Sequence, residues 1–234
     1  MDNTSKENNQ SLEDTVKNLK NIVEEQKKKI EILNKEIKEI KSELDQIKKG
    51  KEISLKTCYE NSNSLIYQNE YDLIYNWISP NTKIKLELIY KASIDGDSAE
   101  NFHKKCDNIH KSTLVVIQSI NGYRFGGYTT GNWGNYIDQE DANAFVFSLT
   151  NKNKVKVQSP NEPVAISPAS NLGPIFGFPT IEIRSNCLSN KSSIIYYDSR
   201  YKINTNQFIG IDSINHIYFQ VDDYEVYQVI FLSV

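Results

Sequence analysis

The chain has 234 residues, a mass of 26.9 kDa and a formal net charge of −3, from 27 Lys and Arg against 30 Asp and Glu. Its hydrophobic share of 38% supports a packed core, but a mean hydropathy of −0.54 is low for a wholly globular chain, so we expect part of it to stay unburied. The apolar stretch near the end, residues 229–232, is too short to span a bilayer. The first residues lack the apolar segment of a secretory signal, and three widely spaced cysteines make no disulfide framework. We therefore expect a cytoplasmic protein, with the nucleus as the alternative compartment.

The distribution of charge and aromatic residues divides the chain at about residue 50. Residues 1–50 contain 11 Lys and 11 Asp or Glu, so 22 of 50 positions are charged and the segment is neutral overall. Every aromatic residue and every proline follows position 58. We therefore expect residues 1–50 to form a coiled-coil oligomerisation segment, residues 51–64 a linker, and residues 65–234 a folded domain.

The first segment carries a heptad repeat. A stripe with a mean period of 3.5 residues cannot be buried on an isolated helix, so it predicts self-association with another copy. Branched residues at the a positions and mostly leucine at the d positions favour a parallel dimer, although isoleucine at two d positions leaves a trimer open. The predicted seam alternates steps of four and three residues and is interrupted by one glutamine: Leu12, Val16, Leu19, Val23, Gln26, Ile30, Leu33, Ile37, Ile40, Leu44 and Ile47.

The residues beside this stripe agree with a paired helix. Glu36 with Lys41, and Glu43 with Lys48, are opposite charges placed to join the g position of one helix to the e position of its partner. Gly50 stands where we expect the helix to stop. The alternative is a lone, solvated, charged helix, for which a sustained heptad repeat has no function.

Residues 65–234 have the alternation and the turns of a β-rich domain. Asn121-Gly122 between two strand-like runs predicts a tight hairpin. Helical periodicity predicts two short helices, at Glu70 to Ile78 and at Ser98 to Cys106. Together these patterns predict an α+β fold, an antiparallel β-sandwich core flanked by short helices and preceded by a long coiled-coil helix. The expected strands cover residues 84–90, 114–117, 123–125, 144–149, 155–157, 180–184, 194–197, 217–221 and 224–232.

Seven segments of this second part occur in the order typical of one family, at residues 88–98, 102–108, 113–117, 121–129, 143–149, 173–177 and 223–229. The series resembles the TLDc domain, the module shared by the oxidation-resistance proteins and their relatives, over about residues 65–234. The resemblance implies a non-enzymatic protein-binding module with a role in protection against oxidative stress. Several family members bind the vacuolar proton-pumping ATPase, so the resemblance also implies that binding. The motif positions are Asp95, Gly96, Phe125, Gly126, Gly127, Tyr128, Gly173, Phe176, Gly177 and Glu225.

The residues themselves favour structural roles at these positions. Gly126-Gly127 in a strand allows either a bulge or a close approach of another chain segment. Asp95-Gly96 predicts a turn between a strand and a helix. In an alternating strand Glu225 shares a face with Tyr227 and Val229, so a buried Glu225 would need a hydrogen-bond donor.

The chain offers few residues in patterns that carry chemistry. The spacing of His103, Cys106 and His110 is the most metal-like, but a zinc site needs a fourth ligand, and we favour Cys106 as a small apolar residue packed beside Phe102. The sequence contains no nucleophile elbow, phosphate-binding loop or His-Glu-x-x-His pair. We therefore predict no catalytic residue, no cofactor and no metal. Fourth-ligand candidates for the zinc alternative would be Asp107, Cys58, Cys187 or His216.

Two rival functions belong to other classes. A cysteine-dependent redox enzyme would need a thiol with a depressed pKa and a resolving partner, and no cysteine has a Cys-x-x-Cys neighbour. A transcription-associated DNA-binding protein would use the coiled coil as its dimerisation arm. With only three arginines and a neutral first segment, the chain lacks the basic face that nucleic-acid binders present.

Overall fold

The computed structural model describes the backbone of residues 3–58, 64–107, 109, 111–158, 164–196, 201–211, 213 and 215–232, and within the first of these ranges the side chains of residues 16–45. The chain divides into two compact units, Met1–Asn61 and Ser62–Val234. Among the described residues, no helix combines the length and the hydrophobicity that a bilayer crossing requires.

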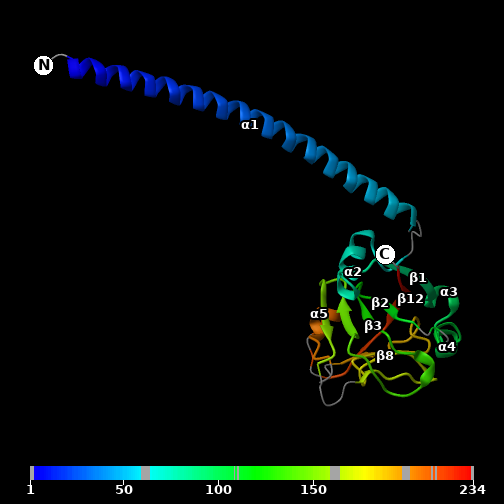
Figure 1. The fold of residues 1–234 in the computed structure, drawn as a ribbon. Helices are drawn as coiled ribbons and strands as arrows, with labels where there is room; N and C mark the ends of the chain where they lie inside the picture. Colours follow the sequence, from blue (N-terminus) through cyan, green and yellow to red (C-terminus); the bar gives the residue numbers. More distant parts are fainter. Residues whose placement is uncertain are drawn as a thin grey trace. The chain divides into compact units, whose positions relative to one another are not determined.

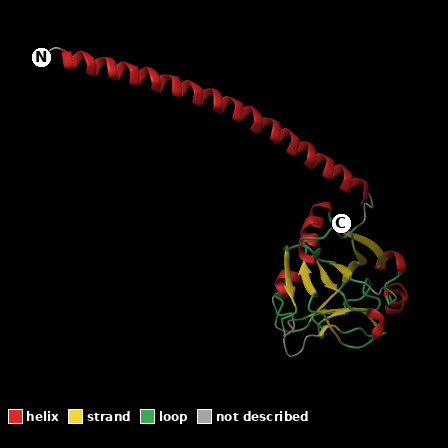
Figure 2. Cartoon of the chain, in the orientation of Figure 1, coloured by secondary structure: helices red, strands yellow, loops and turns green. Residues whose placement is uncertain are grey.

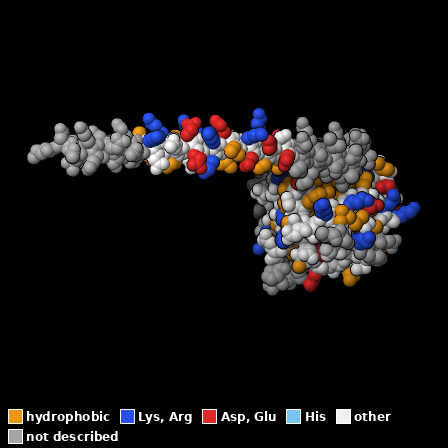
Figure 3. All heavy atoms as spheres, turned by 45° about the horizontal axis from the view of Figure 1, so that its top comes forward, with side chains coloured by type: hydrophobic (Ala, Val, Ile, Leu, Met, Phe, Trp, Pro, Cys, Tyr) orange, Lys and Arg blue, Asp and Glu red, His pale blue; other side chains and the backbone are white. Residues whose placement is uncertain are grey.

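The first unit is built on one helix, α1 (Asn3–Cys58), of 56 residues (Figure 1). The expected stop at Gly50 is wrong, because α1 continues through it to Cys58. A glycine costs a helix about 1 kcal/mol relative to alanine, but it ends the helix only where the chain also turns into a left-handed conformation. All side chains from residue 16 to residue 45 are exposed, with charged groups along the helix surface and apolar ones between them (Figure 3).

The second unit is an antiparallel sandwich of two six-stranded sheets with short helices around them (Figure 2). The first sheet contains, in spatial order, β1 (Ile84–Lys91), β12 (Val221–Phe231), β2 (Thr113–Ser119), β3 (Arg124–Thr129), β5 (Phe145–Ser148) and β6 (Asn153–Lys156). The second contains β11 (Ile217–Phe219), β10 (Ser193–Ile195), β9 (Ile181–Arg184), β8 (Leu172–Phe176), β7 (Val164–Ile166) and β4 (Gln139–Glu140). The helices are η1 (Gln68–Glu70), α2 (Tyr71–Ile78), α3 (Ala92–Asp95), α4 (Ala99–Cys106), η2 (Trp133–Asn135) and α5 (Thr205–Ile209). The predicted α+β sandwich is confirmed.

Local sequence signals account for several of these elements. The β2–β3 hairpin turns at Asn121-Gly122, where Gly122 has a φ of +80° and its amide donates to the Ser119 carbonyl at 2.8 Å. Helix α4 begins where its sequence predicts, since the Ser98 hydroxyl accepts the amide of Asn101 at 3.1 Å. Both predicted short helices are therefore present.

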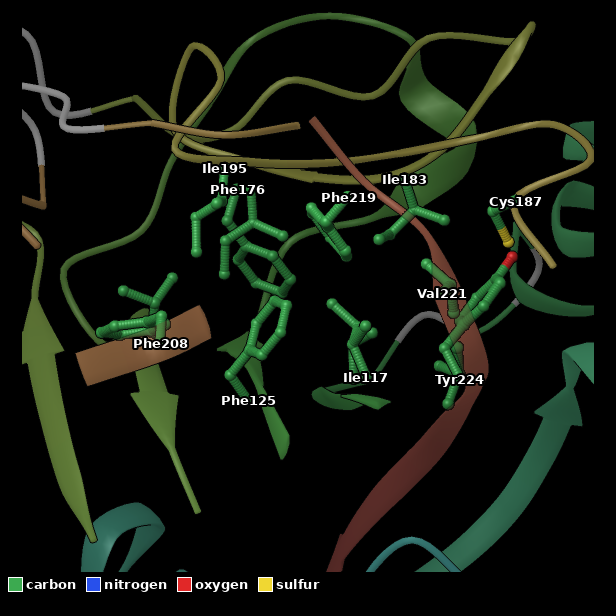
Figure 4. Close-up of a cluster of buried hydrophobic side chains, with 14 of the residues drawn as sticks. Ile117, Phe125, Phe176, Ile183, Cys187, Ile195, Phe208, Phe219, Val221 and Tyr224 are labelled. Carbon is green, nitrogen blue, oxygen red and sulfur yellow. The ribbon is translucent and has the colours of Figure 1, made fainter. Parts of the chain in front are cut away.

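The core lies between the two sheets. Phe125 of the first sheet and Phe176 of the second point toward one another (Figure 4). The Phe125 ring also meets Phe219 edge to face, with centroids 5.4 Å apart. A second apolar layer covers the outer face of the first sheet, where Trp77 of α2 packs on Phe147 at a centroid distance of 5.7 Å. The first sheet is therefore covered on both faces.

One predicted strand changes sheets. Residues 217–221 read as a single run, but β11 ends at Phe219 and β12 begins at Val221, and these strands belong to different sheets. The carbonyl of Gln220, between them, accepts from the Ile120 amide at 3.2 Å. Elements β4, β7, β8, α3 and α5 were not predicted as such. Each has five residues or fewer.

Candidate functional site

The motif glycines Gly126 and Gly127 permit close packing on both faces of β3. A Cβ on Gly127 would lie 2.4 Å from the Phe176 ring of the opposite sheet, so two motif positions form one contact across the core. On the other face, a Cβ on Gly126 would lie 1.9 Å from the Val115 carbonyl oxygen. The sequence left two explanations for Gly126-Gly127, a β-bulge or a close approach of another chain segment. The register of β3 with β2 and with β5 has no shift, so the two glycines serve close approach and form no bulge.

Asp95 and Gly96 form the end of α3. The Asp95 carboxylate accepts the Lys91 amide at 2.9 Å and lies 3.1 Å from the Lys105 ammonium. Gly96 has a φ of +89°, and its carbonyl accepts the Tyr90 hydroxyl at 2.6 Å. These residues close a turn between β1 and α4 and bind neighbouring parts of the chain.

The other motif positions also lie within the sandwich. A Cβ on Gly173 would lie 3.1 Å from the carbonyl oxygen of Ile183. Gly177, just after β8, has a φ of +68°. Tyr128 stacks on Phe145, with centroids 5.2 Å apart. The structure does not gather the motif residues into one exposed site.

Glu225 lies in the middle of β12 and is 1% exposed. Its carboxylate accepts the Lys91 ammonium at 2.7 Å, the Leu65 amide at 2.9 Å and the hydroxyl of Tyr227. The donors that a buried Glu225 requires are therefore all present. Burial disfavours the charged ammonium of Lys91, but the hydrogen bond and charge of Glu225 outweigh it and raise the pKa of Lys91 above its ordinary value. Burial and the Glu225 charge also raise the pKa of Tyr227, so its hydroxyl remains a neutral donor.

A second buried ion pair holds the same stretch of chain. Arg124 of β3 binds Glu70 through both terminal nitrogens, at 2.5 and 2.6 Å, and donates to the Leu65 carbonyl at 2.9 Å. Its guanidinium carbon lies 3.5 Å from the centroid of the Tyr67 ring. The backbone of Leu65 is thus bound on its amide side by Glu225 and on its carbonyl side by Arg124. We call residues 64–70 with these two ion pairs the anchor segment. The strand alternation placed Tyr227 on the same face as Glu225, but no sequence pattern indicated Lys91 or Leu65.

The zinc alternative finds no support in the described residues. His103 directs Nδ1 to the Asp107 carboxylate at 2.7 Å and Nε2 to the carbonyls of Ala169 and Leu172, both at 2.9 Å. Cys106 is fully buried on the helix face that packs into the core, as expected. His110 and the side chain of Cys58 lie outside the described part, within which no group of three potential metal ligands occurs.

The two described cysteines, Cys106 and Cys187, lack the properties of redox-active thiols. Burial, followed by the charge of Asp97, raises the pKa of Cys187 to about 12. Burial and the Asp107 charge raise the pKa of Cys106 far above its ordinary value. The Cys187 sulfur lies beside the Tyr224 hydroxyl in the closed core (Figure 4). A reactive thiol needs exposure and a depressed pKa, and neither residue has them.

Sequence reasoning missed an open polar depression of about 760 Å³ beside α4. Its lining includes His103, Asp107 and Tyr136, whose hydroxyl donates to Asp107 at 2.5 Å and whose ring meets His103 edge to face. Lys104 and Glu100 bring both signs of charge to the rim. The residues of the depression come from segments about 30 residues apart or more, so no local pattern announces it.

We predict that Glu225→Gln lowers the free energy of unfolding of the second unit by about 1.5–3 kcal/mol, because it removes the charged acceptor of Lys91, Leu65 and Tyr227 and leaves Asp223, at 3.4 Å, as the carboxylate paired with the Lys91 ammonium. Denaturant unfolding followed by tryptophan fluorescence measures this directly. Both tryptophans, Trp77 and Trp133, lie in the second unit, so the signal does not include α1.

Glu87→Gln is the matched control. Glu87 lies on β1 and pairs with Lys85 at 3.5 Å on the exposed surface, so its loss should change the same free energy by less than about 1 kcal/mol. Similar effects of the two substitutions would contradict the role assigned to Glu225.

We predict that Cys106 and Cys187 do not react with a thiol reagent in the folded protein and react fully after denaturation, because the thiolate is the reacting form. The measurement uses Cys58→Ser, so that the two described thiols give the whole signal. Labelling of either one within minutes in native buffer would return a redox function to consideration.

Comparison with known families identifies the larger part of the chain. A family model described as TLDc domain matches residues 59–230, a span of 172 of the 234 residues. A search of curated proteins found no match. The matched span contains both sheets apart from the last residue of β12, and it includes the whole anchor segment. The chain therefore belongs to the TLDc domain family.

Proposed function

We propose that this protein is a non-enzymatic adaptor that self-associates through α1 and binds a protein partner with its TLDc domain. The observation that carries the proposal is the exposed apolar stripe on α1. Within residues 16–45, eight predicted seam residues have exposed fractions between 45% and 63%: Val16, Leu19, Val23, Ile30, Leu33, Ile37, Ile40 and Leu44.

The energetics of α1 favour a second helix over a solvated single one. Burying a valine, leucine or isoleucine side chain contributes about 1.5–3 kcal/mol, and the stripe offers eight such residues. The ion pairs within the helix, Glu24 with Lys27 at 3.6 Å and Glu25 with Lys29 at 3.0 Å, are exposed and contribute only about 0.3–0.5 kcal/mol each. The alternative of a lone charged helix leaves the stripe unexplained.

Membership of the TLDc family supports the second half of the proposal. The resemblance implies binding to the vacuolar proton-pumping ATPase and a part in oxidative-stress protection, and we propose both for this chain, acting in the cytoplasm. Two TLDc domains on one coiled coil would bind a target with two sites far more tightly than one domain, without any new contact. The coiled coil thereby sets the valency of the adaptor.

The rival functions have less support. The described thiols are buried, which disfavours a cysteine-based enzyme. Among the arginines, Arg124 is buried against Glu70, Arg184 pairs with Glu182, and Arg200 lies outside the described residues. The described arginines are thus engaged by glutamates, and the DNA-binding alternative loses its best phosphate ligands.

The test compares three forms of the full chain for binding to the immobilised peripheral sector of the vacuolar proton-pumping ATPase. We expect Ile30→Asn with Ile37→Asn to remove self-association and to weaken binding by tenfold or more, since avidity is lost while the TLDc surface is unchanged. The measurement is an equilibrium binding titration at matched chain concentration.

Lys28→Asn with Lys35→Asn is the control, because these exposed residues occupy f positions on the side of α1 opposite the seam. It should bind as the unmodified chain does. Equal binding by the seam variant would remove the avidity role, and no binding by any form would remove this ATPase as the partner.

A further inference from the structure

The two rows of residues that flank the seam of α1, the e positions and the g positions, differ in charge. The e positions hold four lysines and one asparagine: Lys20, Lys27, Asn34, Lys41 and Lys48. The g positions hold Thr15, Ile22, Lys29, Glu36 and Glu43. Of these ten, every residue within the range 16–45 is exposed and able to face a second helix.

A parallel pair of α1 helices avoids every like-charge contact between these rows. In that arrangement a g residue meets the e residue five positions further along the second copy. Glu36 then meets Lys41, and Glu43 meets Lys48, as attractive pairs. Lys29, the cationic g residue, meets the neutral Asn34.

An antiparallel pair places the e row of one helix against the e row of the other. Because that row is cationic except for Asn34, its contacts bring Lys20 toward Lys41 and Lys48, and Lys27 toward Lys41. Like charges along a seam destabilise the pairing and select against it.

The same residues select the register of the parallel pair. A shift by one heptad in either direction would bring Lys29 against Lys41 or against Lys27 of the second copy. It would also place Gln26 opposite a leucine, whereas in register the two glutamines lie opposite one another and can exchange hydrogen bonds.

We propose that the partner of the α1 stripe is a second copy of this chain, parallel and in register, selected by the lysine row at e and the placement of Asn34 and Gln26. This proposal rests on the self-association proposed above and adds its orientation. Both TLDc domains then follow the same end of the coiled coil. A bivalent target must therefore present its two binding sites near one another, whereas an antiparallel pair would separate the domains by a helix of about 80 Å.

Disulfide trapping tests the orientation in the full chain with Cys58→Ser. Val16→Cys sits at an a position, so in a parallel, in-register pair its two copies meet within the range a disulfide spans. We expect oxidised glutathione to convert most of this variant to a covalent dimer. Asn18→Cys, at an outward c position, is the control and should yield at least fivefold less.

The outcomes separate the two proposals. A disulfide that forms only when Val16→Cys is mixed with Ile47→Cys would overturn the parallel orientation but keep self-association. No product from Val16→Cys, alone or in that mixture, would overturn self-association itself and the parallel pair with it.

A charge-swapped variant gives a second measurement that needs no cysteine. It combines Glu36→Lys, Glu43→Lys, Lys41→Glu and Lys48→Glu. In a parallel pair the variant matches itself but opposes the unmodified chain at each swapped contact, so co-refolded mixtures should contain less than half the statistical share of mixed dimers. In an antiparallel pair each swapped residue faces a residue that is not swapped, so mixed dimers gain no extra like-charge contacts and form in the statistical share. Statistical mixing would therefore contradict the proposal.

Discussion

Two buried ion pairs hold the anchor segment, the first described residues of the TLDc domain, to the first sheet. Two buried charges, Glu225 on β12 and the guanidinium of Arg124 on β3, bind the amide and the carbonyl of Leu65 from opposite sides. Each is neutralised by a buried partner, Lys91 and Glu70 respectively. Removing Glu70 would leave the buried guanidinium of Arg124 without its counter-charge, which is strongly destabilising. The segment that leads from the first unit into the TLDc domain is thereby held to the outer face of the first sheet.

Patterns that repeat locally could be predicted from the sequence. The α1 helix, the two short helices and the Asn121-Gly122 hairpin are specified by residues within a few positions of one another. The change of sheet at Gln220 could not be predicted, because period-two alternation is the same whichever sheet a strand joins. Two partners of Glu225 were missed for a related reason. Lys91 and Leu65 are 134 and 160 residues away in the chain, and only the folded sandwich brings them together.

The motif residues and the functional surfaces of this protein are different sets. Gly127 with Phe176, and Asp95 with Lys105, hold parts of the TLDc domain to one another. Binding must use what the fold leaves exposed. The stripe on α1 was visible in the sequence because its period is regular, whereas the depression beside His103 and Tyr136 is assembled from distant loops.

The proposed valency, orientation and avidity of this protein all depend on self-association through α1. Sedimentation equilibrium of the unmodified full chain, over a range of concentrations from below 1 to about 100 µM, tests it most directly. For a dimer we expect a mass of twice the chain mass of 26.9 kDa over most of that range. A mass equal to that of one chain at every concentration would contradict it.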